Sequence, residues 1–178
     1  MHQARRVMTA KKAHARHHSA ATGRGKQSPF VGLISDTHGL LRPQAREALC
    51  GASLILHAGD VGGADVLRGL AELAPVIAVR GNNDHGEWAE NLPERALVVL
   101  ANLRVLVVHE RAALKQPLAG LVDLVVSGHS HRPHYERQGG IEYLNPGSAG
   151  PRRFRLPVSL ARLWLQPKPR VELVTLAI

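Results

Sequence analysis

The chain has 178 residues and one cysteine, Cys50, so it is long enough for a single domain and cannot form an internal disulfide. No apolar run approaches the ~20 residues of a membrane-spanning helix, and we expect no membrane span. The net charge of +9 is uneven, because seven of the 23 Lys/Arg lie in residues 1–28, which hold no Asp or Glu. The remaining sixteen Lys/Arg face fourteen Asp/Glu, so the body of the chain predicts no basic nucleic-acid groove.

Residues 1–28 are predicted to be a basic disordered tail, and residues 29–178 to form one folded domain. The tail has almost no large apolar residues and cannot bury enough surface to offset its ordering entropy. It also lacks the apolar segment of a secretory signal, and the lone cysteine fits a reducing compartment, so we expect a cytoplasmic protein. Two interpretations of the tail stay open: an extension without a role, or weak electrostatic contact with nucleic acid or an anionic membrane.

The first half of the domain alternates predicted strands and helices. The apolar runs that predict strands are Phe30–Ile34, Ser53–His57 and Pro75–Val79. The predicted helices are Pro43–Cys50, which opens on proline and is closed by Gly51, and Gly63–Leu73, whose apolar residues recur every three or four positions. Each strand ends at a polar cluster, and open α/β sheets place their sites at such ends.

The second half is richer in strands. Predicted strands cover Ala96–Leu100, Leu103–Val108, Val122–Val126, Ile141–Leu144, Val158–Leu165 and Val171–Leu176. The first two form a hairpin around Ala101-Asn102, and a Gly139-Gly140 turn precedes the fourth. A short helix is predicted over Ala112–Leu121, interrupted by Pro117. The pattern predicts an α/β domain with two sheets rather than one.

Polar clusters follow five of these apolar runs, within the segments SDTHG, HAGD, RGNND, VHE and SGHSHRP. They contain seven candidate metal ligands: Asp36, His38, Asp60, Asn82, His109, His129 and His131. Singly, each has a plain explanation as a turn former, a helix cap or a hydrogen-bonded histidine. Together, seven nitrogen and oxygen ligands are too many for one ion, and suit two divalent cations that share an Asp. Glycines before Asp60, Asn82 and His129 permit close backbone approach.

Two such cations, roughly 3.5–4 Å apart, would hold a bridging water and lower its pKa from about 15.7 towards ~7. With two Asp ligands and one hydroxide the site stays net positive and attracts a phosphate anion. The predicted function is therefore a phosphoesterase, first of all a phosphodiesterase, in which the bridging hydroxide attacks phosphorus. Mn is the first expectation for the metal, with Fe, Ni, Zn or Mg as alternatives.

These motifs resemble the calcineurin-like metallophosphoesterase superfamily, and within it the small YfcE-like phosphodiesterases. GLISDTHG, ILHAGD, VRGNND, the lone His109, SGHSHRP and NPGS match that family's signatures in order, over roughly residues 30–178. The resemblance implies a two-sheet β-sandwich flanked by helices, a small phosphodiester substrate and, by analogy, a homodimer. It assigns one metal to Asp36, His38, Asp60 and His131, and the other to Asp60, Asn82, His109 and His129, so that Asp60 bridges them.

The leaving group has no assigned proton donor. Larger superfamily members have a histidine directly after the metal-binding Asn, where this chain has Asn83. Without a general acid, esters with poor leaving groups suffer most, so we expect activity on activated phosphodiesters. His85 is a weak candidate for this role, against a plain surface loop residue. Glu110 stands where the family usually has glycine, and could hydrogen-bond a ligand histidine, add negative charge near the site, or face solvent.

Several further polar residues have both a functional and a structural interpretation. Arg80 could hold a phosphate oxygen or be a structural arginine, and Asp84 is expected to orient a ligand or cap a turn. Asn145 and Ser148, in NPGS, line the site or form a plain turn. His57 is predicted to be a hydrogen-bonded interior histidine and His134 to be peripheral.

Two alternatives to an enzyme of small diesters stay open. The first is a non-catalytic metal-binding scaffold, because the small retromer subunit resembles these enzymes but has lost ligand histidines. The second is a nuclease, for which the basic tail could supply phosphate contacts. All seven ligand positions are occupied in this sequence, which favours catalysis.

Overall fold

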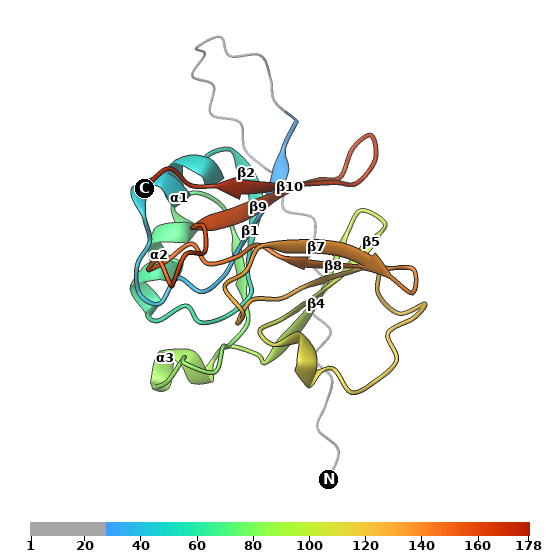
Figure 1. Ribbon diagram of the computed structural model, residues 1–178, viewed down its shortest axis with the longest axis horizontal. Coiled ribbons are helices and arrows are strands. Elements are labelled where there is room, and N and C mark those ends of the chain that lie inside the picture. The colour runs from blue at the N-terminus through green and yellow to red at the C-terminus, as the bar shows by residue number, and fades with distance from the viewer. Residues whose placement is uncertain (1–27) are drawn as a thin grey trace.

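The computed structural model describes residues 28–178, so the tail predicted over residues 1–28 lies almost entirely outside the described range (Figure 1). The described residues form two five-stranded mixed sheets with few helices, as predicted. The first sheet has the order β10-β9-β1-β2-β3 and the second the order β4-β5-β6-β8-β7. No helix among residues 28–178 is long and apolar enough to cross a membrane. The predicted homodimer and cytoplasmic location stay predictions.

The first sheet is built from the alternating half of the sequence and the C-terminal strands. Its strands are β1 (Phe30–Ile34), β2 (Ala52–His57), β3 (Val76–Ala78), β9 (Ser159–Trp164) and β10 (Arg170–Thr175). The first three are parallel, and parallel neighbours require crossover connections, which α1 (Pro43–Leu49) and α2 (Ala64–Ala71) supply. The other two strands pair antiparallel, so the sheet is mixed.

The second sheet comes from the strand-rich half. Its strands are β4 (Arg95–Leu100), β5 (Leu103–Val108), β6 (Leu124–Val126), β7 (His134–Gln138) and β8 (Ile141–Asn145). β5, β6 and β8 run parallel, and the hairpins β4–β5 and β7–β8 are antiparallel. The carboxyl ends of β5 and β6 therefore lie at one edge of this sheet, as those of β1, β2 and β3 do in the first.

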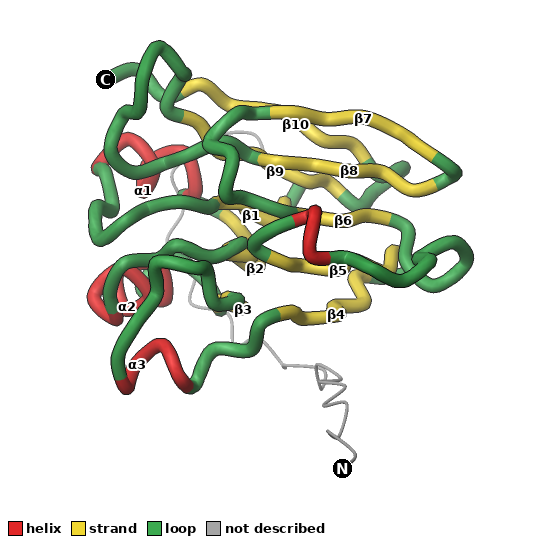
Figure 2. The backbone as a smooth tube through the Cα atoms, turned by 60° about the horizontal axis from the view of Figure 1, so that its bottom comes forward, coloured by secondary structure: helices red, strands yellow, loops and turns green. Residues whose placement is uncertain are grey.

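The β1 strand explains how the layers pack, because its side chains alternate between two cores. Val31 and Leu33 join a buried cluster that contains strands of both sheets, so they fill the space between the sheets. Phe30 and Ile34 join a second cluster with α1 and α2, which therefore cover the other face. Figure 2 shows α1, α2 and α3 gathered at one end of the tube and the strands of both sheets extending away from them.

The predicted helix over Ala112–Leu121 is wrong. The structure has only a short 3₁₀ helix at Arg111–Ala113, followed by irregular chain. Pro117 lacks an N–H and disfavours helical backbone in the residue before it, so an α-helix cannot continue. Leu114 and Leu118 still pack against the outer face of the second sheet.

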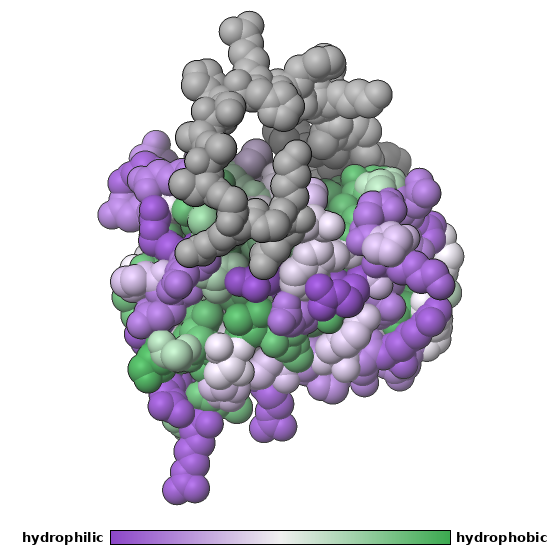
Figure 3. All heavy atoms as spheres, turned by 90° about the horizontal axis from the view of Figure 1, so that it is seen from above, coloured by the Kyte–Doolittle hydropathy of each residue, from purple (hydrophilic) through white to green (hydrophobic). Residues whose placement is uncertain are grey.

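Two elements were not predicted. The helix α3 (Glu87–Glu90) has only four residues, too few for an apolar periodicity to appear. β7 reads HYERQ and is largely exposed, because it is an edge strand that pairs only with β8. On the face shown in Figure 3, hydrophilic and hydrophobic side chains are interspersed wherever the grey atoms leave the surface visible.

Candidate metal centre

The candidate ligands follow strands whose carboxyl ends meet between the two sheets. Asp36 and His38 follow β1, Asp60 follows β2, and Asn82 follows β3. From the second sheet, His109 follows β5, and His129 and His131 follow β6. Backbone hydrogen bonds fasten these loops together, from Asp36 N to Gly59 O at 3.0 Å, from His38 N to Asp60 O at 2.9 Å, and from Gly128 N to His109 O at 2.9 Å.

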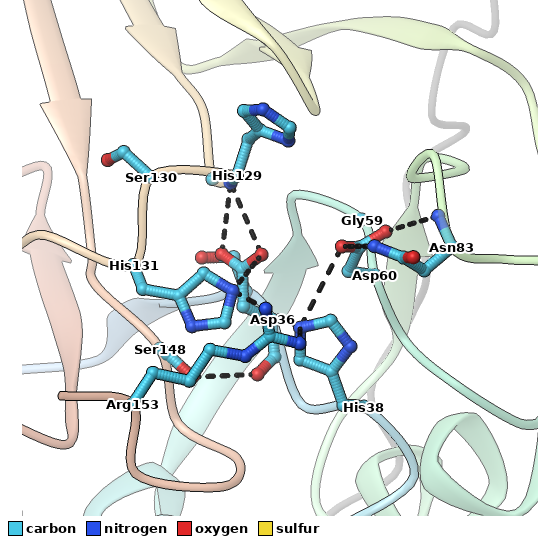
Figure 4. A network of polar contacts seen from close by, with 12 residues as sticks. Asp36, His38, Gly59, Asp60, Asn83, His129, Ser130, His131, Ser148 and Arg153 are labelled. Carbon is cyan, nitrogen blue, oxygen red and sulfur yellow. Dashed lines mark hydrogen bonds and ion pairs between the residues drawn. The ribbon is translucent and has the colours of Figure 1, made fainter.

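The first group of side chains consists of Asp36, His38 and His131, which lie around a common point (Figure 4). The two histidine rings are stacked, and their Nε2 atoms are 3.2 Å apart. His131 Nε2 is 3.4 Å from Asp36 Oδ1. His38 Nε2 is 3.7 Å from Asp60 Oδ2, which connects this group to the next.

The second group consists of Asn82, His109 and His129, and it adjoins Asp60. Asn82 Oδ1 lies 2.9 Å from His109 Nε2 and 2.9 Å from His129 Nδ1. His109 Nε2 is also 3.4 Å from Asp60 Oδ2. The same Asp60 oxygen therefore stands between His38 of the first group and His109 of the second.

In the second group, a neutral His109 ring leaves lone pairs that face one another. His109 Nδ1 lies 2.8 Å from the Ala58 carbonyl oxygen and must donate to it. In the neutral ring, Nε2 then carries a lone pair that points at oxygens of Asn82 and Asp60. In the first group, the buried His131 Nδ1 has no hydrogen-bond partner among residues 28–178. Nitrogen and oxygen donors that converge in this way are of the kind that hold divalent cations.

The backbone at these positions is held in a sparsely populated conformation. Seven described residues other than glycine have positive φ, and five of them are candidate ligands: Asp36, His38, Asp60, His129 and His131. Left-handed backbone costs such residues of order 1–3 kcal/mol each, and such strain is retained at functional sites. The surrounding hydrogen bonds therefore hold the ligands in positions that the local sequence alone would not favour.

Two of the predicted glycines allow the loops to touch. A Cβ on Gly81 would lie 2.1 Å from both Asp60 N and Asp60 Oδ1. A Cβ on Gly128 would lie 2.7 Å from Asp36 Oδ2. A larger residue at either position would displace a candidate carboxylate, so the loops approach as closely as the sequence predicted.

Burial and hydrogen bonding give the two carboxylates different acidities. Burial raises the pKa of Asp36 to about 6. Burial also raises the pKa of Asp60, but hydrogen bonds from Asn83 and from His109 in its protonated form outweigh it and hold the pKa below its ordinary value. For His109, burial lowers the pKa, but hydrogen bonds to Asp60 and the Ala58 carbonyl raise it overall. Burial lowers the pKa of His131 to about 4, so this imidazole is neutral and able to bind a metal at neutral pH.

Residues beside the ligands hold them in place. Asn83 donates to both carboxylate oxygens of Asp60, from its backbone N at 2.8 Å and from Nδ2 at 2.7 Å. The buried Asp84 accepts from Gly62 N and Gly81 N, both at 2.8 Å, and thereby ties the β2 and β3 loops together. Asp84 therefore fastens the loop that carries Asn82, and its predicted role of orienting a ligand or capping a turn stays a prediction.

His57 is an interior histidine, as predicted. Its Nδ1 accepts from Gly59 N at 3.2 Å, so its Nε2–H donates to Thr37 Oγ1 at 2.8 Å. The Thr37 hydroxyl in turn donates to Val61 O at 2.9 Å. Burial lowers the pKa of His57 to about 4, so it stays neutral and links the β1 and β2 loops.

Asn145 and Ser148 act on the ligand loops through the backbone. Asn145 Nδ2 donates to Gly128 O at 2.6 Å, just before His129. The Ser148 hydroxyl donates to Asp36 O at 2.8 Å. Both residues are buried, and neither belongs to a plain surface turn.

A cleft of about 700 Å³ adjoins the second group, and its walls include Asn82, His109, His85 and Arg80. The Arg80 guanidinium forms an ion pair with Glu94 at 3.0 Å, which favours its structural interpretation. A second cleft of about 460 Å³ lies beside His129. Glu110 is exposed and lines both clefts. His134 is exposed on β7, as its predicted peripheral position requires.

One residue at the site was not predicted. Arg153 Nη2 lies 3.5 Å from His38 Nε2, and its side chain reaches across the first group (Figure 4). The sequence signal that could have revealed it is the arginine-rich PRRFR segment just after NPGS.

Residues 30–168 match the family described as the calcineurin-like phosphoesterase superfamily domain. The chain belongs to this superfamily. A probable metallophosphoesterase of Methanocaldococcus jannaschii is 34% identical over 160 residues, which cover 82% of this chain and 80% of that protein. The superfamily fold and the converging donors agree with the resemblance found in the sequence.

Several solved structures have the same architecture. An archaeal phosphodiesterase is 25% identical, with a TM-score of 0.70, over 83% of this chain and 99% of that one. The phosphoesterase YfcE of E. coli is 27% identical, with a TM-score of 0.63, over 83% and 100% of the two chains. Vps29 of Chaetomium thermophilum is 22% identical, with a TM-score of 0.67, over 84% and 99%, and shares the fold alone.

Proposed function

We propose that this superfamily member is a phosphodiesterase whose centre holds two divalent cations, bridged by Asp60. The observation that carries the proposal is the position of Asp60 Oδ2, 3.7 Å from His38 Nε2 and 3.4 Å from His109 Nε2. One carboxylate oxygen thus adjoins both groups of donors. A single cation would leave one of these groups without a positive charge between its lone pairs.

Each ion would be held by a mixture of histidine nitrogens and side-chain oxygens. Asp36, His38, Asp60 and His131 would hold the first ion, and Asp60, Asn82, His109 and His129 the second. When bound, the two ions would supply Lewis acidity for phosphoryl oxygens and would lower the pKa of a water, so that hydroxide is available to attack phosphorus near neutral pH. Mn is the first candidate because mixed histidine and carboxylate sites accept it, although Fe, Ni, Zn or Mg also fit such donors.

The chain's own residues contribute orientation. Asn83 holds both oxygens of Asp60, and this engagement removes it from the leaving group. His85 lines the cleft beside Asn82 and His109, where the departing alcohol of a diester would lie. A donor on an exposed loop assists catalysis weakly, so diesters with good leaving groups are the expected substrates.

The test is hydrolysis of bis-p-nitrophenyl phosphate by metal-stripped protein, alone and with added Mn, with Asp60→Asn as the control. We expect turnover that requires the metal and is lost in the variant. Folded wild-type protein that binds Mn without turnover would contradict the proposal and favour the scaffold alternative. Binding of single-stranded nucleic acid that weakens steeply with salt, and that loses this salt dependence when residues 1–28 are deleted, would instead favour the nuclease.

A further inference from the structure

Arg153 is placed at the candidate centre by a segment distant in sequence from the ligands. Its Nη2 is 3.5 Å from His38 Nε2, and in Figure 4 the side chain extends past Ser148 toward the space in front of Asp36, between His131 and His38. The arginine is otherwise exposed. A guanidinium therefore stands at the open side of the first group of donors.

The loop that carries Arg153 is fastened to the same backbone that carries Asp36 and His38. Ala149 N donates to Ser35 O at 3.1 Å, and the Ser148 hydroxyl donates to Asp36 O at 2.8 Å. A Cβ on Gly150 would lie 2.2 Å from Thr37 O, so the two segments touch. The position of Arg153 thus follows from packing against the ligand loop.

The loop is also closed on itself. Leu156 N donates to Arg153 O at 3.2 Å, and Ser159 N donates to Ser148 O at 2.9 Å across the base. The next residue, Phe154, has a φ of 53°. Apart from Ala101 in the β4–β5 hairpin, Phe154 is the one positive-φ residue other than glycine in the described chain that is not a candidate ligand. Backbone strain of this kind marks positions that the fold holds for a reason beyond local preference.

The positive charge of Arg153 beside the candidate centre favours binding of an anion. Within residues 28–178, no Asp or Glu forms an ion pair with it, and the side chain that it contacts at the centre is His38, at 3.5 Å. Its neighbour His38 is a candidate ligand of a divalent cation, and two cations side by side repel. An anion that contacts both the guanidinium and the centre removes this repulsion, and arginine presents a planar fork of donors that matches phosphate oxygens.

We propose that Arg153 is a phosphate-binding residue, which donates hydrogen bonds to a non-bridging oxygen of the phosphoryl group and positions it over the centre. The proposal deepens the proposed phosphodiesterase function and rests on it. Arg153 would act on the substrate through its charge and fork geometry, and would make no contribution to holding the metals. Its positive charge would instead oppose metal binding slightly while favouring the anion.

The test compares Arg153→Ala and Arg153→Lys with Arg152→Ala and Arg155→Ala, which remove the same charge from exposed positions of the same loop. By calorimetry, inorganic phosphate is titrated into Mn-loaded protein and Mn is titrated into metal-stripped protein. The constants kcat and KM are measured on bis-p-nitrophenyl phosphate.

For Arg153→Ala we expect phosphate binding weaker by roughly 10- to 100-fold, as for loss of a charge-assisted hydrogen bond, and a raised KM. Mn binding should be as tight as in the wild type or tighter. Arg153→Lys should recover part of the loss, and both control variants should stay within about twofold of the wild type.

Opposite effects on phosphate and Mn are the signature of this role. Equal weakening of both in Arg153→Ala would mean that the residue is structural, and would overturn the proposal. Unchanged phosphate binding, or equal losses in the two control variants, would overturn it as well. Phosphate titration requires no turnover, so failure of the phosphodiesterase proposal would be visible separately, as Mn-loaded wild-type protein that hydrolyses nothing.

Discussion

Gly81→Ala tests whether close packing of the loops sets the geometry of the centre. The new Cβ would lie 2.1 Å from Asp60 N and Asp60 Oδ1, whereas ordinary contact begins at 3.4 Å, so the two loops must separate by about 1.3 Å. A misplacement of about 1 Å at a reacting centre costs on the order of 100-fold in rate. We therefore expect kcat/KM to fall about 100-fold, together with weaker Mn binding, because Asp60 contacts both groups of donors. The forced contact should also lower the free energy of unfolding by about 1–3 kcal/mol.

Gly63→Ala is the matched control, because a Cβ at Gly63 would meet no atom within 4 Å and its φ of 164° is extended backbone. Both variants are assayed on bis-p-nitrophenyl phosphate with Mn, with calorimetry for the metal and thermal unfolding for stability. If Gly81→Ala matched Gly63→Ala in rate and Mn affinity, the steric argument would be refuted. Should Gly81→Ala not fold, Gly128→Ala provides a milder clash, at 2.7 Å from Asp36 Oδ2.

Three further predictions concern single side chains. Asp60→Asn should abolish turnover and weaken both metal sites, since it removes the shared charge; calorimetry that finds one site unaffected would contradict the bridge. His38→Gln should weaken one Mn site more than the other, and equal losses would argue against the division of ligands. Asp123, whose pKa a hydrogen bond from Arg104 lowers to about 2, should stabilise the fold above about pH 4 and lose this contribution as the pH falls through about 2. Asp123→Asn should therefore lower the free energy of unfolding by at most about 1 kcal/mol at pH 7, because the Asp123–Arg104 ion pair is partly exposed, and should have no effect below pH 2. Denaturant unfolding at a series of pH values measures this dependence.

The strands of the first half were predictable because their signal is local. β1 and β2 are short apolar runs bounded by glycine and polar residues, and α1 opens on Pro43. The helix predicted over Ala112–Leu121 is wrong because apolar residues of this segment pack against a sheet without forming a helix. β7 was not predictable from the sequence, because an exposed edge strand carries few apolar residues and only its pairing with β8 makes it a strand.

The sequence by itself determined the seven candidate ligands, because each type of donor follows an apolar run and the order of the motifs can be read along the chain. It also determined that Gly81 and Gly128 precede ligands, although not what they touch. The resemblance implied that the two metals share Asp60, but only the tertiary structure decided that its Oδ2 stands between His38 and His109, and that Arg153 reaches the same place. The physical reason is distance along the chain: these contacts join loops from two sheets, and their geometry follows from sheet packing and strained backbone that no local pattern records.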